Sequence, residues 1–217
     1  ARFDYEKPRD LDQAVKLLVA AKGEAKIIAG GQSLGPILNL RLAQPALLVD
    51  VRGLAELGST TDEREAIVYG AITTHATIED GRVPDSTNGL LRQVARGIAY
   101  RAVRNRGTIG GSLAHADPAA DWLNVMVLLD GEIQVRGAKG ARTIRASALV
   151  KGPLSTVIEA DEIVTSVRVP KLSAKARWSY YKFNRKPGEF AEAIGAFVVD
   201  EARGLWRGIV GATAAAP

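Results

Sequence analysis

Apolar residues recur at helical spacing near the start of the chain and then gather in short continuous runs. The first set predicts an amphipathic helix with Asp10 as its N-cap and Gly23 at its C′ position. The runs at 25–31 and 46–51 are short and bounded by glycine or proline, which predicts buried strands around a turn and a short helix. The opening, up to Gly53, therefore has β-α-β character. The helical positions are Leu11, Ala14, Val15, Leu18 and Ala21.

Shorter elements are predicted in the middle of the chain. The stretch 117–131 predicts a helix with Asp117 as N-cap, Pro118 at its first position and Gly131 at its end. A second helix is predicted at 88–99, and the strand at 161–170 ends at Pro170. The other predicted elements are a strand at 66–73 and a hairpin of 132–137 with 141–146 around 138–140.

Three strand-like runs close the chain, at 178–185, 192–200 and 205–214. They predict an antiparallel meander that begins a further unit without a covering helix, so the last unit is expected to be incomplete. The chain is thus predicted to be an α+β protein with units at 1–57, 58–171 and 172–217.

Composition excludes several kinds of chemistry. The chain is 217 residues long, with 47% hydrophobic and 24% charged residues, which is typical of a globular protein. It has no cysteine, so disulfides, a cysteine nucleophile and iron–sulfur clusters held by its own thiolates are excluded. Its two histidines, His75 and His115, do not predict a metal site.

Charge and hydropathy limit the possible ligands and the location of the protein less strictly. Lys and Arg total 29 against 24 Asp and Glu, and this net charge of +5 suits an anionic ligand without requiring nucleic acid. A solvated face explains the densest basic cluster better than DNA or RNA binding does. No apolar run is long enough for a membrane span and no secretory signal is recognisable, so we expect a cytoplasmic location. The cluster is Arg92, Arg96, Arg101, Arg104 and Arg106.

Two loops carry adjacent glycines beside a small hydroxyl residue. "AGGQSLG" follows a predicted strand, and "GTIGGSLAHAD" precedes the predicted helix at 117–131. Glycine lets backbone N–H groups approach a ligand closely, so such turns favour phosphate, although each alone is also compatible with an empty tight turn. Two such loops can clamp a pyrophosphate, and the absence of G-x-G-x-x-G and of a P-loop lysine points away from a Rossmann or P-loop site.

These loops also carry a family resemblance. "AGGQSLGPILNLRLAQPALLVDV" and "VRNRGTIGGSLAHADPAADW" resemble the paired FAD loops of the FAD-binding (medium) subunits of molybdenum hydroxylases, a family that includes carbon monoxide dehydrogenase and xanthine dehydrogenase. "EADEIVTSVRVP" and "YYKFNRKPGEFAEA" extend the likeness over nearly the entire chain.

The resemblance implies an FAD-binding fold of the vanillyl-alcohol oxidase type, with two α/β subdomains and the start of a smaller C-terminal α/β domain. It places the first loop around the pyrophosphate and the ribityl chain, and has the second loop close on them. The first set is Lys26, Ala29, Gly30, Gly31, Gln32, Ser33 and Leu34. The second set is Thr108, Ile109, Gly110, Gly111 and Ser112.

Five further positions have alternative interpretations. The resemblance has Asp121 bind an adenosine ribose hydroxyl, whereas its place on a first helical turn also suits the helix dipole. Ile98 and Val164 match apolar positions beside the rings, or are ordinary core residues. Tyr180 and Lys182 share one face of a strand and match positions near the flavin, where a cation can stabilise negative charge, but a surface strand would look the same.

The resemblance implies an electron-transfer subunit without a catalytic residue or metal of its own. Noncovalent FAD would take electrons from [2Fe-2S] clusters on an iron–sulfur subunit and pass them to an external acceptor. A third subunit would carry the molybdenum cofactor, the whole forming a dimer of heterotrimers. Gln32 stands where covalent members of the wider fold carry histidine, and His115 is expected to bond locally. The alternatives are a free-standing flavin-dependent oxidoreductase and a basic nucleotide- or RNA-binding module.

Overall fold

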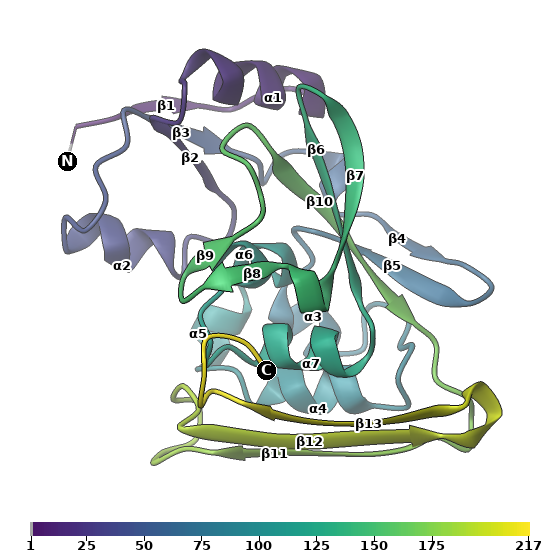
Figure 1. Ribbon diagram of the computed structural model, residues 1–217. Helices are drawn as coiled ribbons and strands as arrows, with labels where there is room; N and C mark the ends of the chain where they lie inside the picture. Colours follow the sequence, from purple (N-terminus) through teal and green to yellow (C-terminus); the bar gives the residue numbers. More distant parts are fainter. Residues whose placement is uncertain (1) are drawn as a thin grey trace.

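A small parallel sheet forms the start of the computed structural model, which describes residues 2–217 (Figure 1). Its strands lie in the order β1-β3-β2, and the two predicted strands are confirmed. β1 is missing from the prediction because its three residues are exposed and show no alternation. The elements are β1 (Asp4–Glu6), α1 (Leu11–Ala20), β2 (Ala25–Ile28), α2 (Leu34–Asn39) and β3 (Leu47–Asp50).

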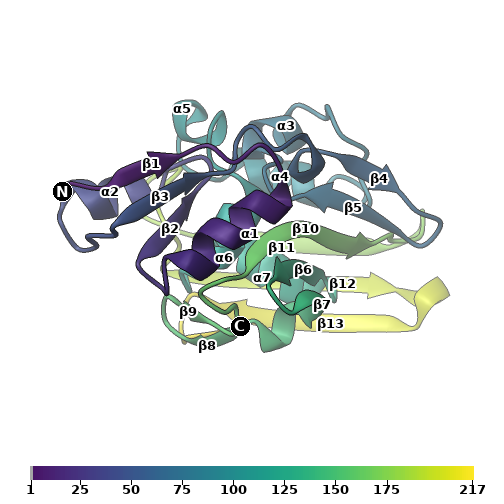
Figure 2. The ribbon, with the colours of Figure 1, turned by 90° about the horizontal axis from the view of Figure 1, so that it is seen from above.

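The first helix has the predicted N-cap. The Asp10 carboxylate accepts a hydrogen bond from the Gln13 N–H at 2.7 Å, which satisfies one of the unpaired amides of the first turn. The helix ends one residue earlier than predicted: Ala21 is its C-cap, and Gly23 lies in the following turn with a φ of 92°. In Figure 2, seen from above, α1 lies on the outside of the molecule, and its apolar face packs on a core that includes Val49 and Ile163.

A five-stranded antiparallel sheet forms the middle of the molecule, in the order β4-β5-β10-β6-β7. The predicted hairpin and the strand that ends at Pro170 are confirmed, while the predicted strand at 66–73 ends at Gly70. The strands are β4 (Thr60–Asp62), β5 (Ala66–Gly70), β6 (Glu132–Gly137), β7 (Gly140–Arg145) and β10 (Ile163–Pro170). Short connections are η1 (Ala55–Leu57), η2 (Ala146–Ala148), β8 (Val150–Gly152) and β9 (Ser155–Thr156).

Five helices accompany this sheet, and the helix predicted at 88–99 is confirmed as α4. The helix expected from Pro118 begins later, with Ala120 as its N-cap. The Asp117 carboxylate instead accepts from the Ala119 N–H at 2.9 Å, so it stabilises a turn before the helix. The helices are α3 (His75–Glu79), α4 (Leu90–Arg96), α5 (Arg101–Arg104), α6 (Ile109–His115) and α7 (Asp121–Leu128). None within residues 2–217 is long and apolar enough to cross a bilayer.

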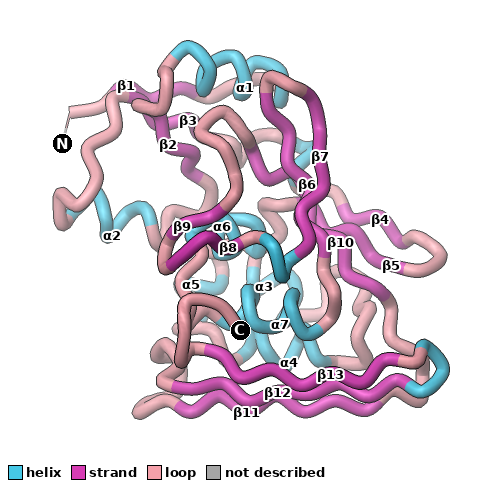
Figure 3. Tube along the Cα trace, viewed as in Figure 1, coloured by secondary structure: helices cyan, strands magenta, loops and turns pink. Residues whose placement is uncertain are grey.

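The predicted meander is confirmed as a third sheet, but the expectation that it lacks a covering helix is wrong for one face. Its inward residues Ala196 and Val198 belong to the core that contains α4 and α7, because these helices lie between this sheet and the five-stranded sheet (Figures 1 and 3). The outer face exposes Tyr181, Phe197 and Trp206. The strands are β11 (Arg177–Phe183), β12 (Ala193–Asp200) and β13 (Leu205–Gly211), with η3 (Glu201–Arg203) between the last two.

The first glycine loop touches the backbone that precedes the second. A Cβ built on Gly30 would lie 1.9 Å from the Arg106 carbonyl oxygen and 2.9 Å from the Gly107 Cα. No side chain fits at that separation, so the two segments meet only because residue 30 is glycine. The four sheets, counting the two-stranded pair of β8 and β9, each lie within one of the ranges 1–57, 58–171 and 172–217, and the division into domains remains a prediction.

We expect Gly30→Ala to destabilise the fold by roughly 1–3 kcal/mol, because the added methyl group must displace backbone rather than a flexible side chain. Gly35→Ala is the matched control, since a Cβ there meets nothing within 4 Å and residue 35 lies within α2. The control is expected to be neutral or to raise the free energy of unfolding by up to about 1 kcal/mol. Urea unfolding of both variants measures the difference, and equal effects would contradict the close approach.

Candidate functional site

A cavity of about 850 Å³ opens between the first sheet, the helical layer and the third sheet. Both glycine loops line it, as the sequence predicts, and so do Lys26, Ile98 and Val164. Ile109 and Tyr180 are the only predicted site residues that do not line it. Ile109 is fully buried in the core, and Tyr180 packs against the same core.

The first loop presents a row of unused donors. Among residues 2–217, the backbone N–H groups of residues 30–34 have no protein acceptor. The Gln32 side chain donates to the Gly30 carbonyl at 3.0 Å, and Gly31 adopts a φ of 72° that favours glycine. Consecutive free amides on a cavity wall form a site suited to an anion, because the donors converge without a charged side chain.

The second loop differs, because most of its amides are already occupied. The N–H groups of Ile109 and Gly110 donate to the carbonyls of Thr73 and Ala71, each at 3.0 Å. The Gly111 N–H donates to the Thr108 hydroxyl at 3.1 Å, and the Ser112 N–H to the Thr108 carbonyl at 3.0 Å. Of the second loop's predicted residues 108–112, only Thr108 has a backbone N–H without an acceptor in the described chain, so this loop offers far fewer free amides than the first. It also contributes glycine surface and the Ser112 hydroxyl.

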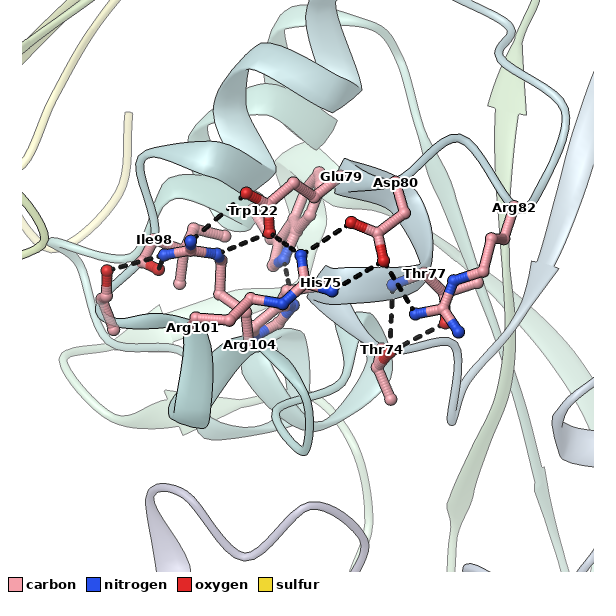
Figure 4. A network of polar contacts seen from close by, with 11 residues as sticks. Thr74, His75, Thr77, Glu79, Asp80, Arg82, Ile98, Arg101, Arg104 and Trp122 are labelled. Carbon is pink, nitrogen blue, oxygen red and sulfur yellow. Dashed lines mark hydrogen bonds and ion pairs between the residues drawn. The ribbon is translucent and has the colours of Figure 1, made fainter.

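A buried histidine fixes the approach to the second loop. The backbone N–H of His75 donates to the Gly107 carbonyl at 2.9 Å. A Cβ on Gly107 would lie 2.7 Å from Nε2 of the His75 ring. His75 Nδ1 accepts from Trp122 Nε1 at 2.9 Å, so the imidazole is neutral with its proton on Nε2 (Figure 4). Burial, helped by the charge of Arg104, lowers the pKa of His75 to about 4. From the sequence alone, His75 is a candidate only for metal binding. Its partner Trp122 is 47 positions away, so no local sequence pattern indicates the pair.

Two arginines of the basic cluster form hydrogen bonds and ion pairs with other residues of the chain. Arg104 donates to Glu79 at 2.7 and 3.2 Å and to the carbonyls of Ile98 and Ala99 at 3.0 and 2.9 Å. Arg101 pairs with Asp80 and also with Glu79 (Figure 4). Burial acts to raise the pKa of Glu79, but the hydrogen bonds and charges of the two arginines outweigh it and lower that pKa. These guanidinium groups hold the segment 98–107 in place, so they do not form a free surface for nucleic acid.

Asp121 is buried and has two partners from the third sheet. Its carboxylate accepts from the Tyr180 hydroxyl and from Lys182 Nζ, each at 2.8 Å. Burial raises the pKa of Asp121, although the charge and hydrogen bonds of its partners oppose the rise. Tyr180 and Lys182 share the inward face of β11, as predicted from their spacing. Asp121 and Lys182 line the cavity together.

The contact between Asp121 and Lys182 bears on the two parts of FAD that these residues are expected to bind. In an extended FAD, the adenosine ribose and the flavin ring lie at opposite ends, joined by the pyrophosphate and the ribityl chain. Two residues in direct contact would then lie near the same end, so Asp121 at the ribose and Lys182 at the flavin are competing predictions.

Other cavity residues escaped the sequence analysis. The sequence gives little indication of them, because most are apolar residues or glycines. Tertiary packing decides which of these residues face the cavity. Gly188 is an example: its φ is 89°, and a Cβ there would lie 2.7 Å from the Ala99 carbonyl oxygen. They include Ile37, Ala43, Ile72, Val103, Leu154, Ser155, Thr156, Ile158, Ile163, Glu189 and Phe190.

Comparison with known proteins fits this geometry. Residues 1–172 match the family described as the FAD binding domain in molybdopterin dehydrogenase. The chain belongs to this family. It is 38% identical over 198 residues to the nicotine 6-hydroxylase medium subunit of Paenarthrobacter nicotinovorans, covering 91% of this chain and 69% of that protein. It is 35% identical over 192 residues to the carbon monoxide dehydrogenase medium chain of Hydrogenophaga pseudoflava, covering 88% and 67%.

Solved structures agree with the family assignment. A carbon monoxide dehydrogenase structure from Hydrogenophaga pseudoflava matches with a TM-score of 0.91 and 34% identity, covering 97% of this chain and 74% of that one. Quinoline 2-oxidoreductase from Pseudomonas putida 86 matches with a TM-score of 0.91 and 33% identity, covering 99% and 75%. The α+β fold and the FAD-binding medium-subunit family are therefore confirmed, and the two alternative functions gain no support.

We expect the pH dependence of stability to contain a contribution from His75. Its pKa is about 4 in the folded protein against an ordinary 6.5, so the unfolded chain takes up a proton first as the pH falls. Stability is then lost between pH 6.5 and about 4, by up to about 3 kcal/mol. His75→Asn keeps an acceptor for Trp122 and cannot titrate, so its unfolding free energy should fall less steeply in this window. Parallel slopes for the two proteins in urea unfolding would contradict this assignment.

Proposed function

We propose that the chain binds one FAD noncovalently in the cavity and serves as the electron-transfer subunit of a molybdenum hydroxylase complex. The observation that carries the proposal is the row of unpartnered N–H groups at residues 30–34, which open onto the cavity. A diphosphate supplies the negative oxygens that such a row can satisfy.

The cavity fits the cofactor in size and in chemistry. Its volume of about 850 Å³ lies within the usual range for cofactor sites. Polar donors are concentrated at the first loop, while Ile98, Val164 and Phe190 supply apolar wall elsewhere, as a ligand with a charged middle and flat aromatic ends requires. Ser112 adds a hydroxyl opposite the first loop.

The chain's own residues would bind and orient the cofactor. The first loop would hold the pyrophosphate with Lys26 nearby, and the second loop would close on it through glycine surface. Lys182 would lie at the flavin end, which we prefer for the Asp121–Lys182 pair over the adenosine ribose. At that end the Lys182 ammonium group can stabilise negative charge on the reduced ring, whereas the adenosine end gains no charge on reduction.

Electron transfer follows from the chemistry that FAD supplies, because a flavin exchanges electrons singly or in pairs. The chain has no cysteine, so [2Fe-2S] clusters would reside on a partner subunit and the molybdenum cofactor on another. The medium-chain and medium-subunit names of the relatives support such an assembly. We propose a dimer of heterotrimers in the cytoplasm that passes electrons to an external acceptor.

Paired substitutions in the first loop test the site. Gly31→Asp and Gly31→Asn have nearly the same shape and face the same φ of 72°, so they differ mainly in charge. We expect the Asp variant to bind FAD at least about tenfold more weakly than the Asn variant, because its carboxylate opposes the pyrophosphate. Fluorescence titration with FAD measures both dissociation constants, and circular dichroism checks folding.

The same pair at Gly111 extends the test to the second loop. Folded Asp variants at both positions that retain stoichiometric FAD would contradict the site. Turnover of a small organic substrate by the isolated FAD-loaded chain would instead favour a free-standing flavin oxidoreductase.

A further inference from the structure

A buried ion pair on the cavity wall joins the helical layer to the third sheet. The Lys182 and Asp121 side chains are 11% and 5% exposed, and Nζ lies 2.8 Å from Asp121 Oδ2. Asp121 is the first residue of α7 and Lys182 lies on β11, so 61 positions separate them in the chain. Removing one partner of such a pair leaves an uncompensated buried charge, which is strongly unfavourable.

The contacts leave one donor of Lys182 unused. Within residues 2–217, Nζ donates to Asp121 and, at 3.3 Å, to the Gly97 carbonyl, while an ammonium group has three hydrogens. Because Lys182 lines the cavity, the third hydrogen is available to a bound molecule. Tyr180 holds the other carboxylate oxygen, and burial together with Asp121 raises the pKa of its hydroxyl, which therefore stays a neutral donor.

The surroundings of the pair suit an aromatic ring system. Lys182 donates to the carbonyl of Gly97, which directly precedes the cavity residue Ile98, and Gly188 packs directly against Ala99. Phe190 also lines the cavity, and the carboxylate of its neighbour Glu189 has its own partner, Arg185, at 3.6 Å. The free amides that suit phosphate belong to the first loop.

We propose that Asp121 is a positioning residue that fixes the Lys182 ammonium group toward the flavin and, by offsetting its charge, holds down the reduction potential of the flavin. This inference rests on the proposed function. Two-electron reduction with uptake of one proton leaves one negative charge on the ring, which a nearby ammonium group stabilises. The Asp121 carboxylate opposes that stabilisation, so the pair as a whole favours reduction less than Lys182 alone.

Charge-neutralising variants test the proposal in the full chain loaded with FAD. In Asp121→Asn the amide oxygen can still accept from Lys182, while the negative charge is gone. We expect its reduction potential to rise, with the preference of the site for reduced over oxidised FAD increasing about tenfold or more. The double variant Asp121→Asn with Lys182→Met should return toward the wild-type potential, because it again has no net charge. Spectroscopic redox titration measures the potentials.

Asp130→Asn is the matched control. Asp130 follows the same helix and pairs with Arg207 at 2.6 Å, but it is 65% exposed and does not line the cavity. It should leave the potential unchanged. A potential in Asp121→Asn that is unchanged or lowered would overturn the inference, as would a double variant that keeps the raised value or an equal shift in Asp130→Asn.

Flavin content separates this inference from the proposed function. If the wild-type chain takes up no FAD, the proposed function fails. A second outcome is that FAD binds in stoichiometric amount and Asp121→Asn changes the affinity for oxidised and reduced FAD by the same factor. The ion pair then lies at another part of the cofactor, and only the inference is wrong.

Discussion

The contact between Gly30 and the backbone of Arg106 and Gly107 is the constraint on which the cavity depends. It brings together two segments separated by 76 positions, at a distance that leaves no space for a Cβ atom. Gly107 is enclosed from the other side by His75, whose ring is held by Trp122. The start of the second loop is thus held between the first loop and the helical layer, and both contacts are made to its backbone.

The two loops look alike in sequence but differ in function because of what surrounds them. The second loop lies against the turn that follows β5 and is capped by Thr108, and these use most of its amides for structure. The first loop follows β2 at the open side of the small sheet and has no neighbour that could accept its hydrogen bonds, so residues 30–34 keep their donors for a ligand. A glycine pair therefore shows where backbone can approach closely, and only the neighbouring acceptors decide whether its amides are free.

Much of the fold could be predicted from local pattern, including α1 with its Asp10 cap, the β6–β7 hairpin and the closing meander. The predictions failed where the deciding partner is distant in the chain. β1 is three exposed residues, too short for its pairing with β3 to give a periodic signal, and the start of α7 depends on a turn closed by Asp117. The two partners of Asp121 come from β11, so spacing alone could not separate a ribose ligand from half of an ion pair. Family resemblance was needed to select the predicted cavity residues, since most of them are ordinary glycines and aliphatic residues, and it left other lining residues such as Phe190 unpredicted.

The position of Lys182 links the cavity to the docking of the third sheet. Along β11, Tyr180 and Lys182 both face α7 and Lys182 also lines the cavity, while Tyr181 and Phe183 alternate onto the outer face. The ammonium group reaches the cavity only when β11 packs on the helices, because both of its acceptors, Asp121 and the Gly97 carbonyl, belong to the helical layer. A ligand that contacts Lys182 and the first loop together binds only this packed arrangement and must stabilise it by linkage. For such a ligand, binding affinity and the attachment of the third sheet are therefore thermodynamically coupled.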